Sequence, residues 1–214
     1  MHNLPFDTVN LNAGEVDTLE EVYNALKAKY DIGLPEDSVV NINQFDLITC
    51  DNDPNRHSDM RLGGVLQINN TPNECYLVFI KLRFYTGNKA RSGEGLDLYG
   101  YLVWGYVKQK KDFGCVLIRR KTLTDRLVGL VHHVEIEFPD DKAFDKKFYV
   151  VGNDEEKAKS AMTYNFRNVL MDIKDENILI EAINHSLIIG TGNDLDTNEV
   201  INLAEIAVKI ASVR

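Results

Sequence analysis

The sequence predicts an α+β protein with a largely antiparallel sheet. Between residues 42 and 133, apolar and polar residues alternate with a period of two in several short runs. Helical spacing dominates at the N-terminus and in the last third of the chain. The regular strand–helix alternation of doubly wound folds is missing, which favours α+β over α/β.

An amphipathic helix is predicted over residues 18–30. Thr18 and Glu21 have the spacing of a capping box. Apolar residues then recur on one helical face until Gly33 and Pro35, which end the helix. The residues of this face are Leu19, Val22, Tyr23, Leu26 and Tyr30.

Strands rich in aromatic and β-branched residues follow this helix. We expect them at residues 45–50, 64–68, 75–85, 96–108, 114–120 and 132–138. In FIKLRFY, Phe79 and Lys81 face one side while Ile80 and Leu82 face the other, which indicates a half-buried antiparallel sheet. A short helix is predicted over residues 122–131.

The last third predicts a strand–helix–hairpin–helix unit. The strand covers residues 148–151, after which Asn153 and Glu156 are spaced to cap a helix, or two abutting helices, reaching residue 173. Residues 178–183 and 186–189 form a hairpin, and Thr197 caps a final helix. With 214 residues, the chain fits one continuous α+β domain or two packed halves, 1–121 and 122–214.

Residues 113–212 resemble uncharacterised bacterial proteins collected as the domain of unknown function DUF3137. The resemblance begins at FGCVLIRRK and continues through VEIEFPDDKAFDKKFYVVGNDEEKAKSAMTYNFRNVL. The matching positions are Asp141, Phe144, Phe148, Val150, Asp154, Met162, Thr163 and Phe166. We interpret these residues as core, turn and helix-cap residues. The resemblance therefore implies a shared scaffold and assigns no catalytic residue. Relatives often carry membrane helices ahead of this region, whereas this chain does not.

Composition and charge argue against several classes of function and cellular location. The net charge of −9 argues against a nucleic-acid partner, which requires a basic surface. Cys50, Cys75 and Cys115 are odd in number, far apart and without zinc-ligand spacing, which favours a reducing, cytoplasmic location. The N-terminus lacks signal-peptide features and no apolar run approaches the ~20 residues of a membrane helix. We expect a soluble protein without membrane insertion.

His133, Glu135 and Glu137 alternate along one predicted strand, so their side chains share a face. An imidazole and two carboxylates could bind a divalent metal or transfer protons. The alternative is a solvated outer face, with the inward side formed by Val134, Ile136 and Phe138.

The main basic cluster combines Arg119, Arg120 and Lys121 with lysines that precede them. Lys108, Lys110 and Lys111 lie between the strand ending at Lys108 and the one beginning at Gly114, which we interpret as a hairpin. The cluster could receive an anionic ligand or a lipid head group. The alternative is a solvated hairpin end.

These observations favour a non-enzymatic binding or protein-interaction module without a cofactor. The acidic charge suggests a basic protein as its partner. The alternative is a metal-dependent hydrolase that uses His133, Glu135 and Glu137, or His57 with the nearby aspartates. We expect any working surface in the loops at residues 51–61 and 86–95, which the resemblance does not reach.

Overall fold

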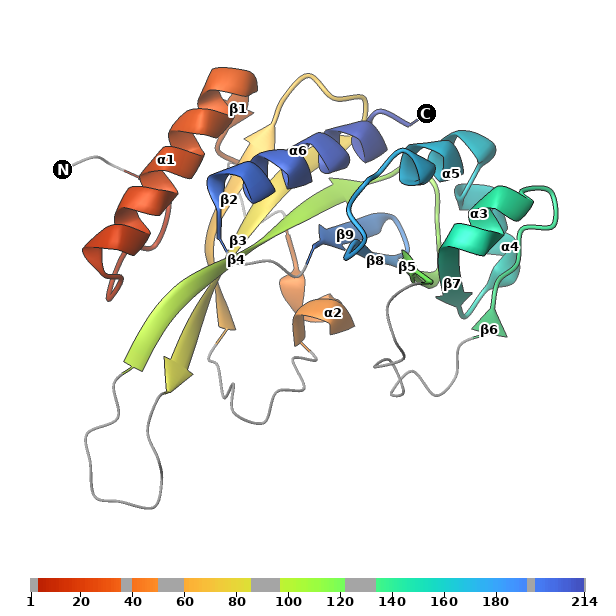
Figure 1. The fold of residues 1–214 in the computed structure, drawn as a ribbon, viewed down its shortest axis with the longest axis horizontal. Helices are drawn as coiled ribbons and strands as arrows, with labels where there is room; N and C mark the ends of the chain where they lie inside the picture. The colour runs from red at the N-terminus through yellow and green to blue at the C-terminus, as the bar shows by residue number, and fades with distance from the viewer. Residues whose placement is uncertain are drawn as a thin grey trace, which may run out of the picture.

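The computed structural model describes residues 4–35, 40–49, 60–85, 97–121, 134–191 and 195–213. In this part of the chain, nine antiparallel strands form one sheet in the order β1-β2-β3-β4-β9-β8-β5-β7-β6 (Figure 1). The strands are β1 Ile32–Gly33, β2 Met60–Ile68, β3 Glu74–Tyr85, β4 Asp97–Lys108, β5 Cys115–Arg120, β6 Val134–Glu135, β7 Phe148–Gly152, β8 Leu179–Ile183 and β9 Ser186–Gly190. The predicted α+β class with an antiparallel sheet is confirmed.

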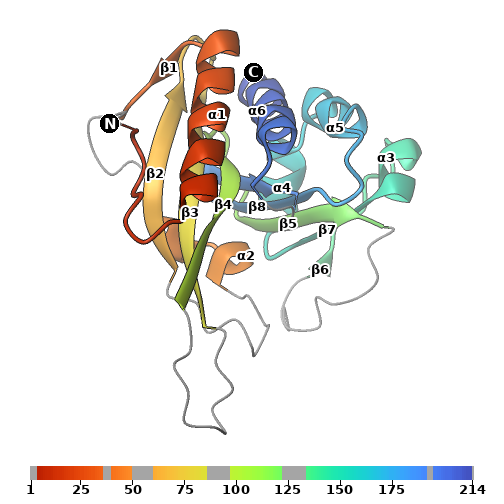
Figure 2. The same ribbon diagram turned by 60° about the vertical axis from the view of Figure 1, so that its left-hand side comes forward.

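Helices cover the two faces of this sheet unequally. They are α1 Ala13–Lys29, α2 Asp46–Thr49, α3 Lys142–Lys147, α4 Glu155–Ala161, α5 Tyr164–Met171 and α6 Thr197–Ala211, with a short 3-10 helix, η1, at Ile42–Gln44. The long helices α1 and α6 lie side by side on one face, and α5 lies beyond α6 (Figures 1 and 2). The small helix α2 lies on the opposite face (Figure 1).

Helix starts follow capping chemistry, but at positions other than those predicted. Helix α1 begins at Ala13 because Asn12 and Glu15 form the capping box, while the Thr18 hydroxyl donates to the Gly14 carbonyl within the helix, at 2.9 Å. Asp154 caps α4 and Asp196 caps α6, each with its side-chain carboxylate. The neighbouring residues Asn153 and Thr197 are therefore not the caps.

The centre of β3 is buried on both faces, so the expectation of a half-buried strand is wrong there. Phe79 lies under the N-terminal segment, where its ring centroid is 4.5 Å from that of Phe6. Ile80 faces the other way, into a second apolar cluster that includes Phe45 and Trp104. Both Phe79 and Ile80 are 0% exposed. The sheet is thus the middle layer between two apolar cores.

Strands β4 and β5 do not form the predicted hairpin. Strands β8 and β9, joined by a turn at Asn184 and His185, lie between them. Strand β9 pairs with β4 and β8 pairs with β5. Segments from before and after residue 121 therefore share one sheet.

Residues 46–49 form α2, whereas the sequence predicted a strand over residues 45–50. The Glu181 carboxylate, which comes from β8, accepts the backbone N–H groups of Asp46 and Leu47 at 3.0 and 2.8 Å. A carboxylate at this position satisfies free donors of the first helical turn. This cap comes from a distant part of the chain, so local sequence does not reveal it.

The region after β5 also differs from the secondary structure that the sequence predicted. The predicted strand at residues 132–138 is represented by the two-residue β6, and α3, which the sequence did not predict, follows with Asp141 as its cap. The helical stretch ending near residue 173 is two helices, α4 and α5, with Thr163 capping the second. The predicted helix at residues 122–131 lies outside the described residues.

Candidate ligand-binding site

Four chain segments surround a cavity of about 560 Å³ at one end of the sheet. They are the turn between β2 and β3, the connection from β4 to β5, the junction of α4 with α5, and the end of α6. Figures 1 and 2 both show the C-terminal end of α6 beside α5. A cavity of this volume is within the range of sites for small molecules.

One wall of the cavity is apolar. Phe113 and Phe166 lie behind it, with ring centroids 5.3 Å apart and a tilt of 55° between the ring planes. Both rings are anchored in the main core, with 1% exposure each. The accessible part of this wall therefore comes from the exposed Pro72 and the half-buried Val213, while Ala161 is buried like the two rings.

Two carboxamides connect the cavity to the end of α6. The Asn73 side-chain N–H₂ donates to the carbonyls of Ala211 and Val213 at 2.9 and 2.8 Å. The Gln109 side-chain N–H₂ donates to the carbonyl of Ile210 at 2.8 Å. These bonds satisfy carbonyls at the end of a helix, where intrahelical partners run out. The amide oxygens receive no hydrogen bond from the described residues.

The remaining polar groups of the lining are two lysines and a threonine. Lys111 Nζ donates to the Ser160 carbonyl at the end of α4, at 3.2 Å. Lys110 is exposed and makes no ion pair or hydrogen bond with the described residues. Thr163, the N-cap of α5, places the positive end of that helix dipole at the same cavity.

The β4–β5 connection is held firmly by backbone contacts with the β8–β9 turn. Gln109 N–H donates to the His185 carbonyl at 2.7 Å, and Phe113 N–H donates to the Asn184 carbonyl at 2.8 Å. An ion pair of 2.8 Å between Asp112 and Lys157 ties the connection to α4. The hydrogen bond from Lys157 lowers the pKa of Asp112, so this carboxylate stays ionised and paired.

The predicted metal-binding strand is only partly described. Glu135 and Glu137 are exposed, and Glu135 pairs with Lys121 at 3.5 Å. Val134, expected to point inward, is 67% exposed. His133 lies outside the described residues, as do His57 and the loops at residues 51–59 and 86–95. In the described part of the chain, no three His, Cys, Asp or Glu side chains are grouped to hold a metal ion.

The predicted basic cluster is divided by the fold. Lys110 and Lys111 precede β5, whereas Arg119 and Arg120 are at the end of that strand and are 7% and 1% exposed. The alternative prediction, that the basic residues lie at a solvated hairpin end, is therefore wrong for both arginines. Only Lys121 of the triplet is exposed. Buried guanidinium groups inside the fold cannot form a surface site for an anion.

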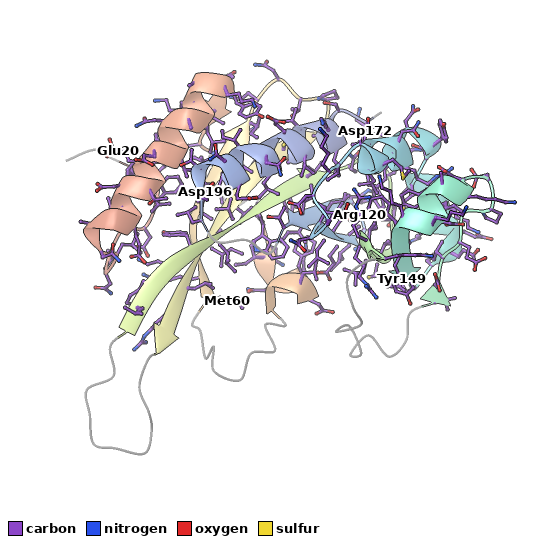
Figure 3. All side chains as sticks on the ribbon, in the orientation of Figure 1. Glu20, Met60, Arg120, Tyr149, Asp172 and Asp196 are labelled. Atoms are coloured by element: carbon purple, nitrogen blue, oxygen red, sulfur yellow. The ribbon has the colours of Figure 1, made fainter. Side chains whose placement is uncertain are left out.

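The two arginines lie on opposite faces of the sheet because they are consecutive in β5. The Arg119 guanidinium lies 4.8 Å from the Tyr149 ring centroid, and that of Arg120 lies 4.5 Å from the Phe148 ring centroid. Figure 3 shows Arg120 on the side of α5 and α6, with Tyr149 on the other side. Arg120 Nη2 donates to the Ile173 carbonyl, while its Nε and Nη1 have no partner among the described residues.

The carboxylates expected to attract a basic protein are distributed over many elements, and many of them already pair with lysine or arginine. Such pairs join Asp7 to Lys81, Glu74 to Lys108, Asp112 to Lys157, Glu155 to Lys159, Asp140 to Arg167 and Glu205 to Lys29. These paired groups do not form one concentrated acidic patch. A basic protein partner stays a prediction.

Neither described cysteine is an activated nucleophile. Burial raises the pKa of Cys75 to about 12, and burial also raises the pKa of Cys115. A thiol with a raised pKa is protonated near neutral pH and reacts slowly.

The cavity itself was missed by sequence reasoning. Its lining comes from segments that are far apart in the chain, and no spacing rule connects Asn73 with Gln109 or Phe166. The available signal was an apolar residue, Phe113, directly after the four consecutive polar residues 109–112 that follow a strand. That signal alone does not distinguish a cavity from a loop.

No family model and no curated protein matches this chain. A solved structure with similarity to it is the crystal structure of the mycobacterial trehalose monomycolate transport factor A, TtfA. The TM-score is 0.45 at 8% sequence identity, and the match covers 95% of this chain and 99% of the other. In the described residues, no helix is long and apolar enough to span a membrane. The resemblance to DUF3137 stays a prediction.

Proposed function

We propose that this protein is a non-enzymatic binding module that holds a small ligand in the cavity between α5, α6 and the β4–β5 connection. The observation that carries the proposal is the lining, which joins the apolar side chains of Pro72 and Val213 to amide and ammonium groups. A mostly apolar concavity with a few polar groups is typical of ligand sites.

The same lining supports binding rather than catalysis. General acid–base chemistry requires a titratable group within reach of the substrate and a pKa suited to proton transfer. Lys110 and Lys111 are the titratable side chains of this cavity, and it has no carboxylate, imidazole or thiol among its described lining residues. Two ammonium groups attract and orient a ligand but do not form an acid–base pair.

Ligand-observed NMR with a fragment library tests this function. Val213 is half-buried at the cavity, so Val213→Trp places an indole where a ligand would lie. Val9→Trp is the matched control because Val9 is 62% exposed and outside the cavity lining. We expect fragments that bind the wild type and Val9→Trp, lose binding to Val213→Trp, and are recovered chemically unchanged. Hits that are insensitive to Val213→Trp, or no hits at all, would contradict the proposal.

A further inference from the structure

We infer that the free edge of β4 is a self-association surface, where residues 98–102 pair with the same residues of a second copy of this chain as antiparallel strands. This surface lies apart from the cavity lining, and its role does not depend on the proposed function. Three features of β4 point to it: a row of unpaired backbone groups, two leucines on one face and a glycine midway between them.

The edge of β4 that faces away from β3 is paired over only part of its length. All twelve residues of β4 pair with β3, whereas residues 105–108 alone pair with β9. Strand β9 ends at Gly190, on which the Trp104 ring packs, and no described strand lies beside residues 97–104 on this side. Figures 1 and 2 show this end of the β3–β4 pair extending past α1 and α6.

The hydrogen-bonding groups of this edge belong to the odd-numbered residues of β4. Gln109, directly after the strand, donates its N–H to the His185 carbonyl on the β9 side at 2.7 Å. Backbone groups alternate in direction along a strand, and the β3–β4 register runs without a shift, so Tyr99, Tyr101 and Val103 direct their N–H and C=O groups to the same side. These groups make no backbone hydrogen bond to another described residue there. Such a row is a template for one more strand.

This edge lacks the features that keep exposed strand edges from pairing. Along β2, the register shifts between Leu62 and Gly64, and the Gly63 carbonyl accepts the Asp7 N–H of the N-terminal segment. In contrast, residues 98–104 of β4 contain no proline and no charged side chain, and they pair with β3 without a bulge. A flat, apolar, uncharged edge is expected to associate with another strand.

The sequence of the edge indicates that this other strand is a second copy of β4. Residues 98–102 read LYGYL, which is the same in both directions. Antiparallel pairing about Gly100 places Tyr99 opposite Tyr101 of the second copy, so outward N–H groups meet outward carbonyls. A strand pair of this kind is isologous, as in two-fold symmetric dimers.

The side chains fit the same register. Leu98 is 51% exposed, and Leu102 on the same face is only partly buried against the second apolar cluster. In the dimer each Leu98 lies opposite Leu102 of the other copy, where cross-strand apolar contacts stabilise the pair. Gly100 lies on the two-fold axis, and a glycine within a strand allows close approach of another backbone. The net charge of −9 does not oppose this contact directly, because residues 98–102 carry no charge.

Sedimentation equilibrium of the full chain tests the surface with Leu98→Lys. The matched control is Leu34→Lys, because Leu34 is 59% exposed and follows β1 at the far edge of the sheet. Both variants add one positive charge at an exposed leucine, so both are expected to fold, and circular dichroism checks that they do. The interface is small, which predicts a weak and reversible dimer.

We expect the wild type and Leu34→Lys to dimerise with a Kd of about 10–100 µM, and Leu98→Lys to weaken dimerisation at least about tenfold. Equal losses in the two variants would overturn the inference. A wild type that stays monomeric at about 1 mM would also overturn it, whether or not the edge then pairs with an extended segment of another protein.

Disulfide trapping of Gly100→Cys tests the axis. Opposed residues of a non-hydrogen-bonded antiparallel pair have Cα atoms about 4.5 Å apart, which a disulfide can span. Leu98→Cys is the control, since the two copies of that residue would lie about 13 Å apart, four residues along the strand. Under mild oxidation we expect a covalent dimer from Gly100→Cys only, and none from the wild type with its native cysteines. Dimerisation without this selective disulfide would mean that another surface forms the contact.

Discussion

The ammonium group of Lys81 lies 3.3 Å from the Asp7 carboxylate, although the Lys81 side chain is 1% exposed. Lys81 Nζ also donates to the Asp7 carbonyl at 3.0 Å and to the Val9 carbonyl. The Tyr101 hydroxyl donates to the same Asp7 carbonyl at 2.7 Å. One buried cation on β3 therefore holds the N-terminal segment against the sheet.

Lys81→Met is expected to lower the free energy of unfolding by about 2–4 kcal/mol, because the Val9 carbonyl loses its donor and the carbonyl and carboxylate of Asp7 each lose one of their partners. Urea denaturation measures the change. Lys174→Met, at an exposed lysine, is the control and should change stability by less than about 0.5 kcal/mol. A similarly small loss in Lys81→Met would show that the N-terminal segment is not held in this way.

Asp7 should make the stability of the protein depend on pH. Burial raises its pKa, but the hydrogen bond from the Val9 amide and the contacts with Lys81 and Arg61 outweigh burial, so the pKa is lowered from 3.8. A carboxyl group with a lowered pKa stabilises the fold above its unfolded-state pKa and loses this contribution as the pH falls through its folded-state pKa. The stability difference between wild type and Asp7→Asn should therefore shrink as the pH falls from about 5 to 2. Chemical denaturation at each pH tests it, and a constant difference would contradict the assignment.

Glu181 is expected to be required for helix α2. Removing its carboxylate in Glu181→Leu leaves the N–H groups of Asp46 and Leu47 without their acceptor, which costs about 1–3 kcal/mol. Glu181→Gln keeps an oxygen acceptor and should lose less. Hydrogen exchange at the Leu47 amide reports the local effect. Unchanged exchange in Glu181→Leu would be incompatible with the cap.

Glu181 should make stability depend on pH with the opposite sign to Asp7, and Glu181→Gln should remove this dependence. Burial raises the pKa of Glu181 from 4.5, against the effect of the two backbone hydrogen bonds. A carboxyl group with a raised pKa loses stability as the pH rises from its unfolded-state pKa through its folded-state pKa. The same titration of stability with pH measures both residues.

Arg120 offers a test of a buried charge without a paired carboxylate among the described residues. Its guanidinium is 1% exposed, and two of its nitrogens lack partners there. Arg120→Met keeps most of the side-chain volume and removes the charge, so stability should stay within about 1 kcal/mol of the wild type or increase. Arg120→Ala also creates a cavity and should lower it by about 2–4 kcal/mol. Thermal unfolding of both variants decides this, and equal large losses would show that the charge itself is needed.

Local signals in the sequence predicted the elements whose causes are local. Alternation identified the long strands β3 and β4, and the spacing of apolar residues identified α1 and α6. The predictions that failed concern residues whose structure is determined by contacts with distant parts of the sequence. Residues 46–49 become helical because Glu181 caps them, and Arg119 and Arg120 are buried because β7 and β8 enclose their strand.

The candidate site could not be predicted for the same reason. Lys110 and Lys111 were recognised as basic residues, but their partners in the cavity come from the β2–β3 turn, α5 and the end of α6. The residues chosen from the sequence shared a strand or a loop, as with Glu135 and Glu137. Spacing along one element carries no information about which other elements approach it.

The insertion of β8 and β9 between β4 and β5 has a consequence for synthesis on the ribosome. Strands β4 and β5 emerge well before the hairpin that must separate them, so each presents an unpaired edge until residue 190 has been made. Exposed strand edges are sites of wrong pairing between chains, and contacts over long sequence distances form slowly. The nascent chain should therefore depend on protection by chaperones up to the moment when its last strands close the sheet.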